Sequence, residues 1–311
     1  MIEIENASKI YDSTTVVNQV TLTIPPRSIC AIMGRSGSGK TTLMRMINRL
    51  VTPSSGRILI DGQDITTVPA HELRRRIGYV IQGYGLFPHR SVAENIATVP
   101  GLLGWDRKRT AARIDELLAL LKLDPGRFRD RMPHELSGGE QQRVGVARAL
   151  AAQPNILLMD EPFGALDPVI RSSAQDDLIA IQAKTGTTIV LVTHDMEEAM
   201  KLGHRIAVMD KGLVLQCAEP AEIIAHPANA FVAELQGSGD KAFRLLSLQR
   251  LLEHIEQGEA EGPPLSAGIS LREAYSELLW SGRDSAPVEQ DGRVIGRISR
   301  DSIARLAAQP R

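Results

Sequence analysis

The apolar residues of this chain gather in short continuous runs. The runs "SICAIM" (28–33), "YVI" (79–81), "ILLM" (156–159) and "TIVLVT" (188–193) do not alternate with polar residues. Strands that are covered on both faces carry runs of this kind. The pattern therefore predicts an α/β fold with a mainly parallel sheet.

Other apolar segments alternate with polar residues or flank tight turns. "RILIDG" (57–62) alternates, and the segments "RIAVMD" (205–210) and "LVLQCA" (213–218) lie on either side of Lys211 and Gly212. These features are typical of antiparallel strands and hairpins. We expect these segments to form a smaller antiparallel β subdomain beside the main sheet.

A helical pattern separates two of the apolar runs. Ile114, Leu117, Leu118 and Leu121 follow the i, i+3, i+4, i+7 spacing of an amphipathic helix, which predicts a helical insertion over about residues 90–150. The later stretch "QGSGDK" (236–241) has the composition of a flexible junction. The sequence therefore predicts a first domain over residues 1–236 and a C-terminal region over residues 237–311.

Composition limits the classes of partner. Lys and Arg (36) nearly balance Asp and Glu (37), so no overall basic field is available for nucleic acid, and we expect no nucleic-acid partner. No apolar run approaches the roughly 18 residues of a spanning helix, and the N-terminus lacks a signal-peptide pattern. We therefore expect a cytosolic chain that is soluble by itself. Cys30 and Cys217 lie in apolar runs, as small buried hydrophobic residues do.

The segment "GRSGSGKT" (34–41) has the form of a phosphate-binding loop. It follows the run "SICAIM" and precedes the helical segment "TTLMRMINRL" (41–50), which is the context that the motif requires. Its glycines let backbone N–H groups turn toward phosphate oxygens, and Lys40 would reach the β- and γ-phosphates. The predicted nucleotide contacts are Gly34, Arg35, Ser36, Gly37, Ser38, Gly39, Lys40, Thr41 and Thr42.

A magnesium ion is expected beside this loop. Thr41 supplies a hydroxyl, and Asp160, at the end of the run "ILLMD", supplies a carboxylate that acts directly or in the second sphere. Gln82 follows the run "YVI" and is a further candidate for the metal or for the attacking water. An isolated glutamine in a loop often has no such role, and both interpretations stay open.

Three further residues are candidates for catalysis or base stacking. Glu161 follows Asp160 and is predicted to be the general base that polarises water for attack on the γ-phosphate. His194 ends "TIVLVTH" and could hydrogen-bond the γ-phosphate, although a single histidine at a strand end is usually structural. Tyr11 could stack on adenine or could pack on a sheet face.

A second anion site is predicted in "LSGGEQQRVGVARAL" (136–150). Ser137 and Glu140 have the spacing of a capping box, so a helix should begin at Ser137. Gly138 and Gly139 leave the first backbone N–H groups of this helix uncovered. We name Ser137, Gly138, Gly139 and Glu140 the signature segment.

Six elements in a fixed order resemble the nucleotide-binding subunit of the ATP-binding cassette (ABC) family. They are "GRSGSGKT", Gln82, "LSGGEQQR", "ILLMDEP", "GALD" (164–167) and His194, and the resemblance covers about residues 1–235. It implies a P-loop NTPase that hydrolyses ATP with Mg²⁺ and forms a homodimer. In that family the loop of one chain faces the signature segment of the other, so two composite sites form in trans and Asp167 lies at the interface.

The resemblance also indicates a kind of transporter. The segment 82–105 resembles the region by which importer ATPases grip a helix of their membrane permease, and "NIATVPGLLGW" is most similar to the subgroup that imports glycine betaine, carnitine and choline. The resemblance implies permease subunits, an external substrate-binding protein and a peripheral location on the cytoplasmic face of the inner membrane. The alternatives are an importer of another small solute or a soluble ABC-type ATPase acting on nucleic acid or ribosomes.

The tail resembles one motif of a cystathionine-β-synthase (CBS) domain. The similar stretch is residues 269–303, and a single copy implies pairing across the dimer or a degenerate remnant. The nucleotide-binding form of the motif has an acidic residue where this chain has Ser302, with Asp301 displaced by one position. The tail is also basic, so that binding to anionic lipid is an alternative to a solvated helix face; its arginines are Arg293, Arg297, Arg300, Arg305 and Arg311.

Overall fold

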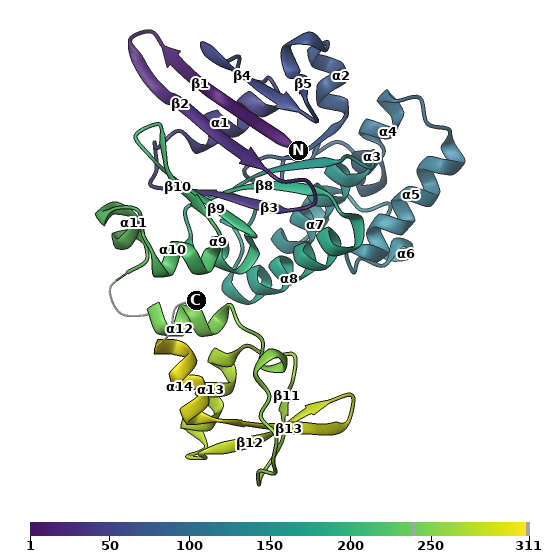
Figure 1. Cartoon of the computed structure of the whole chain (residues 1–311). Helices are drawn as coiled ribbons and strands as arrows, with labels where there is room; N and C mark the ends of the chain where they lie inside the picture. The colour runs from purple at the N-terminus through teal and green to yellow at the C-terminus, as the bar shows by residue number, and fades with distance from the viewer. Residues whose placement is uncertain (238–240, 309–311) are drawn as a thin grey trace. The chain divides into compact units, whose positions relative to one another are not determined.

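The structure, a computed structural model, describes residues 1–237 and 241–308 in two compact units (Figure 1). The units are Met1–Cys217 and Ala218–Arg311. The second unit begins ahead of the predicted domain boundary, because α10 (Pro220–Ala225) packs against α12 (Lys241–Ser247). Part of the predicted junction, residues 238–240, lies outside the described residues. The division into a functional domain and a regulatory region stays a prediction.

A six-stranded sheet forms the centre of the first unit. Its order is β10-β9-β3-β8-β7-β6, and β9, β3, β8, β7 and β6 run parallel. The predicted parallel sheet is therefore confirmed, and β3, β7 and β8 are fully buried, as their continuous apolar runs require. The strands are β3 (Ile29–Met33), β6 (Ile77–Val80), β7 (Ile156–Asp160), β8 (Thr188–Thr193), β9 (Arg205–Asp210) and β10 (Leu213–Ala218).

A second, antiparallel sheet has the order β2-β1-β4-β5. It contains β1 (Ile2–Tyr11), β2 (Thr14–Ile24), β4 (Ser55–Ile60) and β5 (Gln63–Asp64). The expectation that β9 and β10 also belong to this subdomain is wrong. β9 pairs in parallel with β3, and its residues Ile206–Met209 are buried, because both of its faces are covered in the main sheet.

Two apolar cores lie on the two faces of the six-stranded sheet. Cys30, Ile32, Leu158 and Val190 face α1 (Lys40–Ile47) and the antiparallel sheet. Their neighbours on the same strands contact α7 (Gly138–Leu150) and α8 (Pro168–Thr185) on the other face. This arrangement follows from the alternation of side chains along a strand. Packing on both faces holds in place the strands whose carboxyl ends carry the candidate site.

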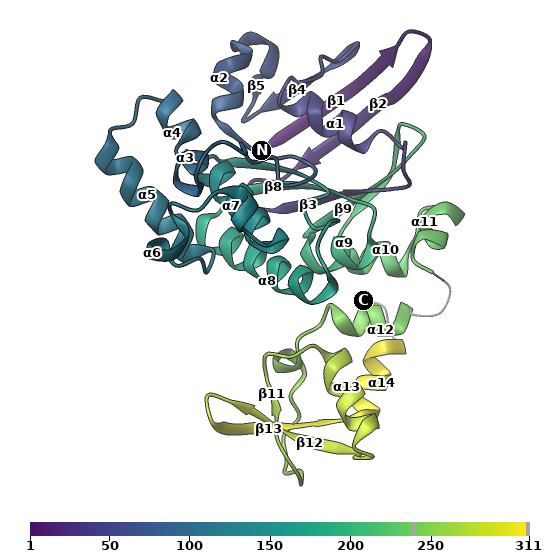
Figure 2. The same cartoon turned by 180° about the vertical axis from the view of Figure 1, so that it is seen from behind.

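The predicted helical insertion is present on the outer side of α7 (Figures 1 and 2). It contains α3 (Val92–Ile96), α4 (Thr98–Leu102), α5 (Arg107–Leu120) and α6 (Pro125–Phe128). Ile114, Leu117 and Leu118 are buried along α5, as their spacing predicts. The other elements of the first unit are α2 (Ala70–Arg75), α9 (Met196–Leu202), and the 3₁₀ turns η1 (Ile65–Thr67) and η2 (Pro133–Glu135).

The second unit has its own small core. A three-stranded sheet of order β11-β12-β13 packs with α13 and α14 around Leu251, Leu271, Leu278 and Ile298. The elements are β11 (Leu265–Ser266), β12 (Ser285–Gln290), β13 (Arg293–Ser299), α11 (Ala230–Leu235), α13 (Leu271–Trp280), α14 (Arg300–Ala308) and the turn η3 (Leu251–His254). Across residues 1–237 and 241–308, no helix has both the length and the apolar character needed to cross a membrane.

Candidate nucleotide site

The predicted phosphate-binding loop connects β3 to α1 and is closely packed. Gly34, Gly37 and Gly39 have φ values of 155°, 77° and 100°. A Cβ atom would lie 2.1 Å from the Met209 carbonyl oxygen at Gly34 and 2.4 Å from the Val16 carbonyl oxygen at Gly39. These positions need glycine because the loop backbone approaches two other strands. The loop therefore leads directly into the N-terminal end of α1, where backbone N–H groups can receive an anion.

Lys40 lies within this loop. Its Nζ donates to the carbonyl oxygens of Gly34 at 2.8 Å and Arg35 at 2.9 Å, and its side chain is buried. Burial lowers the pKa of Lys40, whereas the charges of Glu161 and Asp160 raise it. The nearby Ser38 hydroxyl is buried without a hydrogen-bond partner among the described residues. A buried hydroxyl without a partner beside a glycine loop fits a site that receives polar oxygens.

Thr41 and Asp160 bring two oxygen ligands together. Thr41 Oγ1 donates to Asp160 Oδ1 at 2.9 Å, and Arg45 Nη2 lies 3.7 Å from Asp160 Oδ2. Asp160 is 2% exposed, and burial raises the pKa of its carboxyl group. A hydroxyl and a carboxylate are hard ligands that suit Mg²⁺, and a cation beside Asp160 would offset the cost of its buried charge. The donor set therefore fits the metal expected from the sequence.

Glu161, Gln82 and His194 converge on one another. Gln82 Nε2 donates to Glu161 Oε2 at 3.3 Å, and His194 Nδ1 lies 3.4 Å from Glu161 Oε1. The three residues follow β6, β7 and β8, which are adjacent parallel strands. Parallel strands end at the same edge of a sheet, so residues far apart in the sequence meet there. The structure brings together the three residues that the sequence selected for catalysis.

Tyr11 lies at the end of β1, and the residue is 44% exposed. Lys9 Nζ is 4.8 Å from the centre of this ring. The exposed ring leaves the predicted contact with adenine sterically open. Stacking on the base stays a prediction.

The signature segment has the predicted helix start. Ser137 Oγ accepts from Glu140 N at 3.4 Å, while Glu140 Oε2 accepts from Ser137 N at 2.8 Å and from Ser137 Oγ at 2.9 Å. A Cβ atom on Gly138 would lie 2.4 Å from Tyr84 Oη, and one on Gly139 would lie 2.6 Å from Ile170 Cγ2. A side chain at either position would therefore have to displace Tyr84 or Ile170, so contacts within this chain favour both glycines.

Asp167 begins α8. Its Oδ1 accepts from Val169 N at 3.2 Å and Ile170 N at 3.1 Å. The position of Asp167 is therefore coupled to that of Ile170, which packs on Gly139 of the signature segment. This contact links the segment 164–167 with α7.

Sequence reasoning missed Arg45, which lies beside Asp160. The available signal is its spacing of four residues from Thr41, because residues i and i+4 share a helix face.

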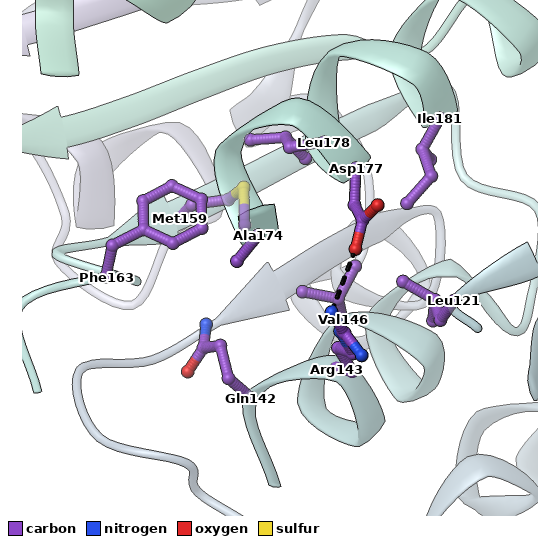
Figure 3. A pocket seen from close by; sticks show the side chains of 10 residues that line it. All are labelled: Leu121, Gln142, Arg143, Val146, Met159, Phe163, Ala174, Asp177, Leu178 and Ile181. Atoms are coloured by element: carbon purple, nitrogen blue, oxygen red, sulfur yellow. Dashed lines mark ion pairs between the residues drawn. The ribbon is translucent and has the colours of Figure 1, made fainter. Parts of the chain in front are cut away.

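The sequence also did not reveal the cavity between α7, α8 and β7 (Figure 3). Asp177 lines this cavity and forms ion pairs with Lys122, at 2.6 Å from Oδ1, and with Arg143, at 3.2 Å from Oδ2. This cavity has a volume of about 20 Å³ and holds about one water molecule. It is too small for a substrate.

The loop, the two oxygen ligands and the Glu161 group define a P-loop ATPase. A family model described as ABC transporter matches residues 17–164. Over 289 residues the chain is 49% identical to the glycine betaine uptake system ATP-binding protein YehX of Escherichia coli, covering 93% of this chain and 94% of that protein. The chain belongs to the ABC transporter family, as an ATP-hydrolysing subunit of an importer.

Two further comparisons agree with this assignment. The chain is 49% identical over 297 residues to the glycine betaine/carnitine/choline transport ATP-binding protein OpuCA of Bacillus subtilis, covering 95% of this chain and 77% of that protein. The dimeric, post-hydrolysis structure of the ATP-binding cassette MJ0796 with ADP and phosphate has a TM-score of 0.63 and 33% identity. This match covers 71% of this chain and 99% of that chain. The first unit therefore has the ABC ATPase fold.

Proposed function

We propose that this chain energises the import of quaternary amine osmoprotectants such as glycine betaine, carnitine or choline. The printed functions of its relatives from Escherichia coli and Bacillus subtilis support this substrate class. The observation that supports ATP hydrolysis most directly is the convergence of Gln82, Glu161 and His194 beside the loop residue Lys40. The substrate itself would be selected by the permease and its external binding protein.

The residues of the site have separate roles in this proposal. Backbone N–H groups of the loop and Lys40 would hold the phosphates of ATP, while Thr41, Asp160 and Gln82 would hold Mg²⁺. When bound, Mg²⁺ neutralises charge on the phosphate oxygens. A carboxylate oxygen of Glu161 takes a proton from the attacking water, and His194 orients Glu161 or the γ-phosphate. The interatomic distances of 3.3 Å and 3.4 Å around Glu161 suit this orientation.

The second anion site has a role only in a homodimer. Ser137 and the backbone N–H groups of Gly138 and Gly139 would contact the γ-phosphate held by the loop of the partner chain. The dimeric state of the MJ0796 cassette, which shares the fold, supports this arrangement. Asp167 would then lie at the dimer interface and connect one site to the other.

The segment 82–105 would dock on the permease at the cytoplasmic face of the inner membrane. Phe87 is 39% exposed, and the guanidinium groups of Arg90 and Arg148 lie 5.0 Å and 5.5 Å from its ring centre. Leu102 and Leu103 are also exposed. An exposed aromatic residue held by cation–π contacts, in a segment with further exposed apolar side chains, suits the contact with an amphipathic helix.

The C-terminal region would be a regulatory, CBS-like unit. The hairpin β12–β13 with α13 and α14 is consistent with one CBS-like motif. Ser302 N donates to Ser299 Oγ at 3.3 Å, and Asp301 is exposed at the adjacent position. Arg300 and Arg297 are paired with Asp284 and Glu256, whereas Arg305 Nε donates to the Asp301 carbonyl oxygen at 3.3 Å. Arg311 lies outside the described residues.

Affinity purification from detergent-extracted membranes tests this function. We expect the full-length chain to co-purify with a polytopic permease, and the reconstituted complex to accumulate labelled glycine betaine only with MgATP and the external binding protein. Transport of a chemically unrelated solute instead would contradict the substrate class. Co-purification with ribosomes or nucleic acid in place of a permease would contradict the transport function.

A further inference from the structure

Two helices begin directly after residues of the candidate site. α8 follows Asp167, and α9 follows His194 and Asp195. Asp195 caps α9, since its Oδ1 accepts from Glu197 N at 2.8 Å and from Glu198 N at 3.2 Å. The positions of these two helices therefore set the positions of Asp167 and His194.

Arg171, on α8, contacts both of these segments. Its Nη2 donates to the Leu166 carbonyl oxygen at 3.1 Å, and its Nη1 lies 3.7 Å from Asp195 Oδ2. One guanidinium group thus joins the residue before Asp167 to the residue after His194. Lys201 adds an outer contact between the helices through its ion pair with Asp176 at 2.8 Å.

Glu198 provides the inner contact between the same helices. It is 5% exposed, and its Oε2 accepts from Gln175 Nε2 of α8 at 3.5 Å. The Thr193 hydroxyl also hydrogen-bonds Glu198, while Thr193 Oγ1 accepts from Asp195 N at 3.0 Å. A hydroxyl has a single hydrogen, so accepting from Asp195 leaves that hydrogen for the Glu198 carboxylate. Glu198 therefore joins the last residue of β8 to α8, across the turn that carries His194.

The surroundings of Glu198 allow both of its ionisation states near neutral pH. Burial raises the pKa of Glu198 to about 7, and the Asp195 charge also raises it. The pKa is lowered by hydrogen bonds with Thr193 and Gln175 and by the charge of Arg171. The strands β3 and β8, which also pack against α9, contain no charged residue. Hydrogen bonds to the ionised carboxylate are stronger than those to the neutral acid.

We propose that Glu198 is a positioning residue for ATP hydrolysis, whose ionised carboxylate ties the His194 turn to α8 and so holds His194 against Glu161. This inference rests on the proposed function of Glu161 and His194. Glu198 does not touch the nucleotide site and acts through Thr193, Gln175 and the helix pair. Protonation of Glu198 loosens this connection, so hydrolysis by the folded protein falls at acidic pH.

The test is the pH profile of MgATP hydrolysis by the full-length chain from about pH 6 to about pH 8.5. For the parent we expect kcat to rise with pH through an apparent pKa near 7, because the pKa of Glu198 is raised to about 7. Glu198→Gln mimics the protonated form and lowers kcat at the alkaline end about tenfold, the loss expected for a hydrogen bond to a charged group. The KM for ATP stays within about twofold of the parent, because the loop is untouched. In this variant the rise of kcat with pH near pH 7, which we call the acidic limb, disappears.

Three further variants separate positioning from a structural role. Gln175→Met keeps the Glu198 carboxylate but removes a bond that lowers its pKa, so the limb moves to higher pH. In a His194→Ala background, Glu198→Gln has an additional effect of less than about twofold, because both changes act on the same step. Glu197→Gln on the exposed face of α9 keeps the profile of the parent and is the matched control.

A Glu198→Gln variant with the kcat and the acidic limb of the parent would overturn the positioning role. An unshifted limb in Gln175→Met would overturn it as well, even if Glu198→Gln fails to fold. These failures differ from a failure of the proposed function, in which the parent chain itself hydrolyses no ATP.

Discussion

Glu161, directly after β7, has a left-handed backbone conformation, which is uncommon for a residue other than glycine. Its φ is 45°, in the left-handed region that costs a non-glycine residue about 1–3 kcal/mol. Glu161 N nevertheless donates to the Val192 carbonyl oxygen at 3.0 Å, which keeps it attached to β8. The strained position directs the carboxylate to Gln82 and His194, where the proposed base is needed.

Replacing Glu161 by glutamine tests this role at the level of one residue. Glu161→Gln keeps the size of the side chain but cannot take a proton from water, so we expect at least about a hundredfold loss of turnover with ATP binding retained. Steady-state hydrolysis and equilibrium ATP binding measure the two properties, and the variant should accumulate as an ATP-bound dimer. Turnover within about threefold of the parent would remove Glu161 from the role of base.

The buried Glu198 predicts a pH dependence of stability as well as of catalysis. Its folded-state pKa of about 7 lies above its ordinary value of 4.5, so the folded protein binds the proton more tightly than the unfolded chain does. The stabilisation is complete below about pH 4.5 and is lost as the pH rises through about 7. Its size is about 3 kcal/mol, by the conversion of pKa shifts to free energy.

Urea unfolding at several pH values measures this effect. Glu198→Gln should remove most of the decline in the free energy of unfolding between about pH 5 and about pH 8, whereas the exposed control Glu197→Gln should keep it. An equal decline in both variants would show that another group is responsible.

At the scale of elements, α7 is the helix whose proposed role depends on a partner chain. Its cap is complete within one chain, and its two glycines lie close to the side chains of Tyr84 and Ile170. Within one chain, the hydrogen bonds of Ser137 with Glu140 are those of the helix cap. The proposed role of Ser137 requires the loop of a second copy.

Mixing two inactive chains tests this requirement. Lys40→Ala damages the loop, and Ser137→Arg blocks the signature segment, so a heterodimer has one doubly damaged site and one intact site. We expect an equal mixture to recover up to about a quarter of the ATP binding of the parent homodimer, because about half of the dimers are heterodimers and each has one intact site of two, although each variant homodimer binds poorly. If both half-sites served the ATP of their own chain, mixing would recover nothing.

At the scale of the whole molecule, the two units divide catalysis from regulation in this proposal. All predicted catalytic residues lie within Met1–Cys217, and the second unit has a separate apolar core. Deleting residues 240–311 should therefore leave MgATP hydrolysis within about threefold of the parent. In reconstituted transporter it should flatten the dependence of transport on internal salt.

Point variants control for damage caused by the deletion. Arg293→Gln with Arg305→Gln removes basic charge without breaking the ion pairs of Arg297 and Arg300, and should weaken the salt dependence in the same direction. Salt dependence that survives both changes would exclude the basic tail as the sensor. Loss of ATP binding in the truncated chain would contradict the division of roles.

Local sequence patterns were sufficient for much of this protein. Continuous apolar runs identified β3, β7 and β8, and the capping box of Ser137 and Glu140 located the start of α7. These predictions succeeded because burial on both strand faces and the spacing of a helix cap are properties of consecutive residues. The order of the motifs was also enough to indicate the ABC family.

Contacts between distant segments required the tertiary structure. The sequence pattern assigned β9 to the wrong sheet. The turn between β9 and β10 is visible in the sequence, but the parallel pairing of β9 with β3 on its other side is not. The spacing of Arg45 from Thr41 placed the two residues on one helix face, but only the fold showed that Arg45 reaches Asp160 and that Glu198 joins Thr193 to Gln175. Strand pairing and buried polar networks depend on which segments the chain brings together, and only the folded molecule decides that.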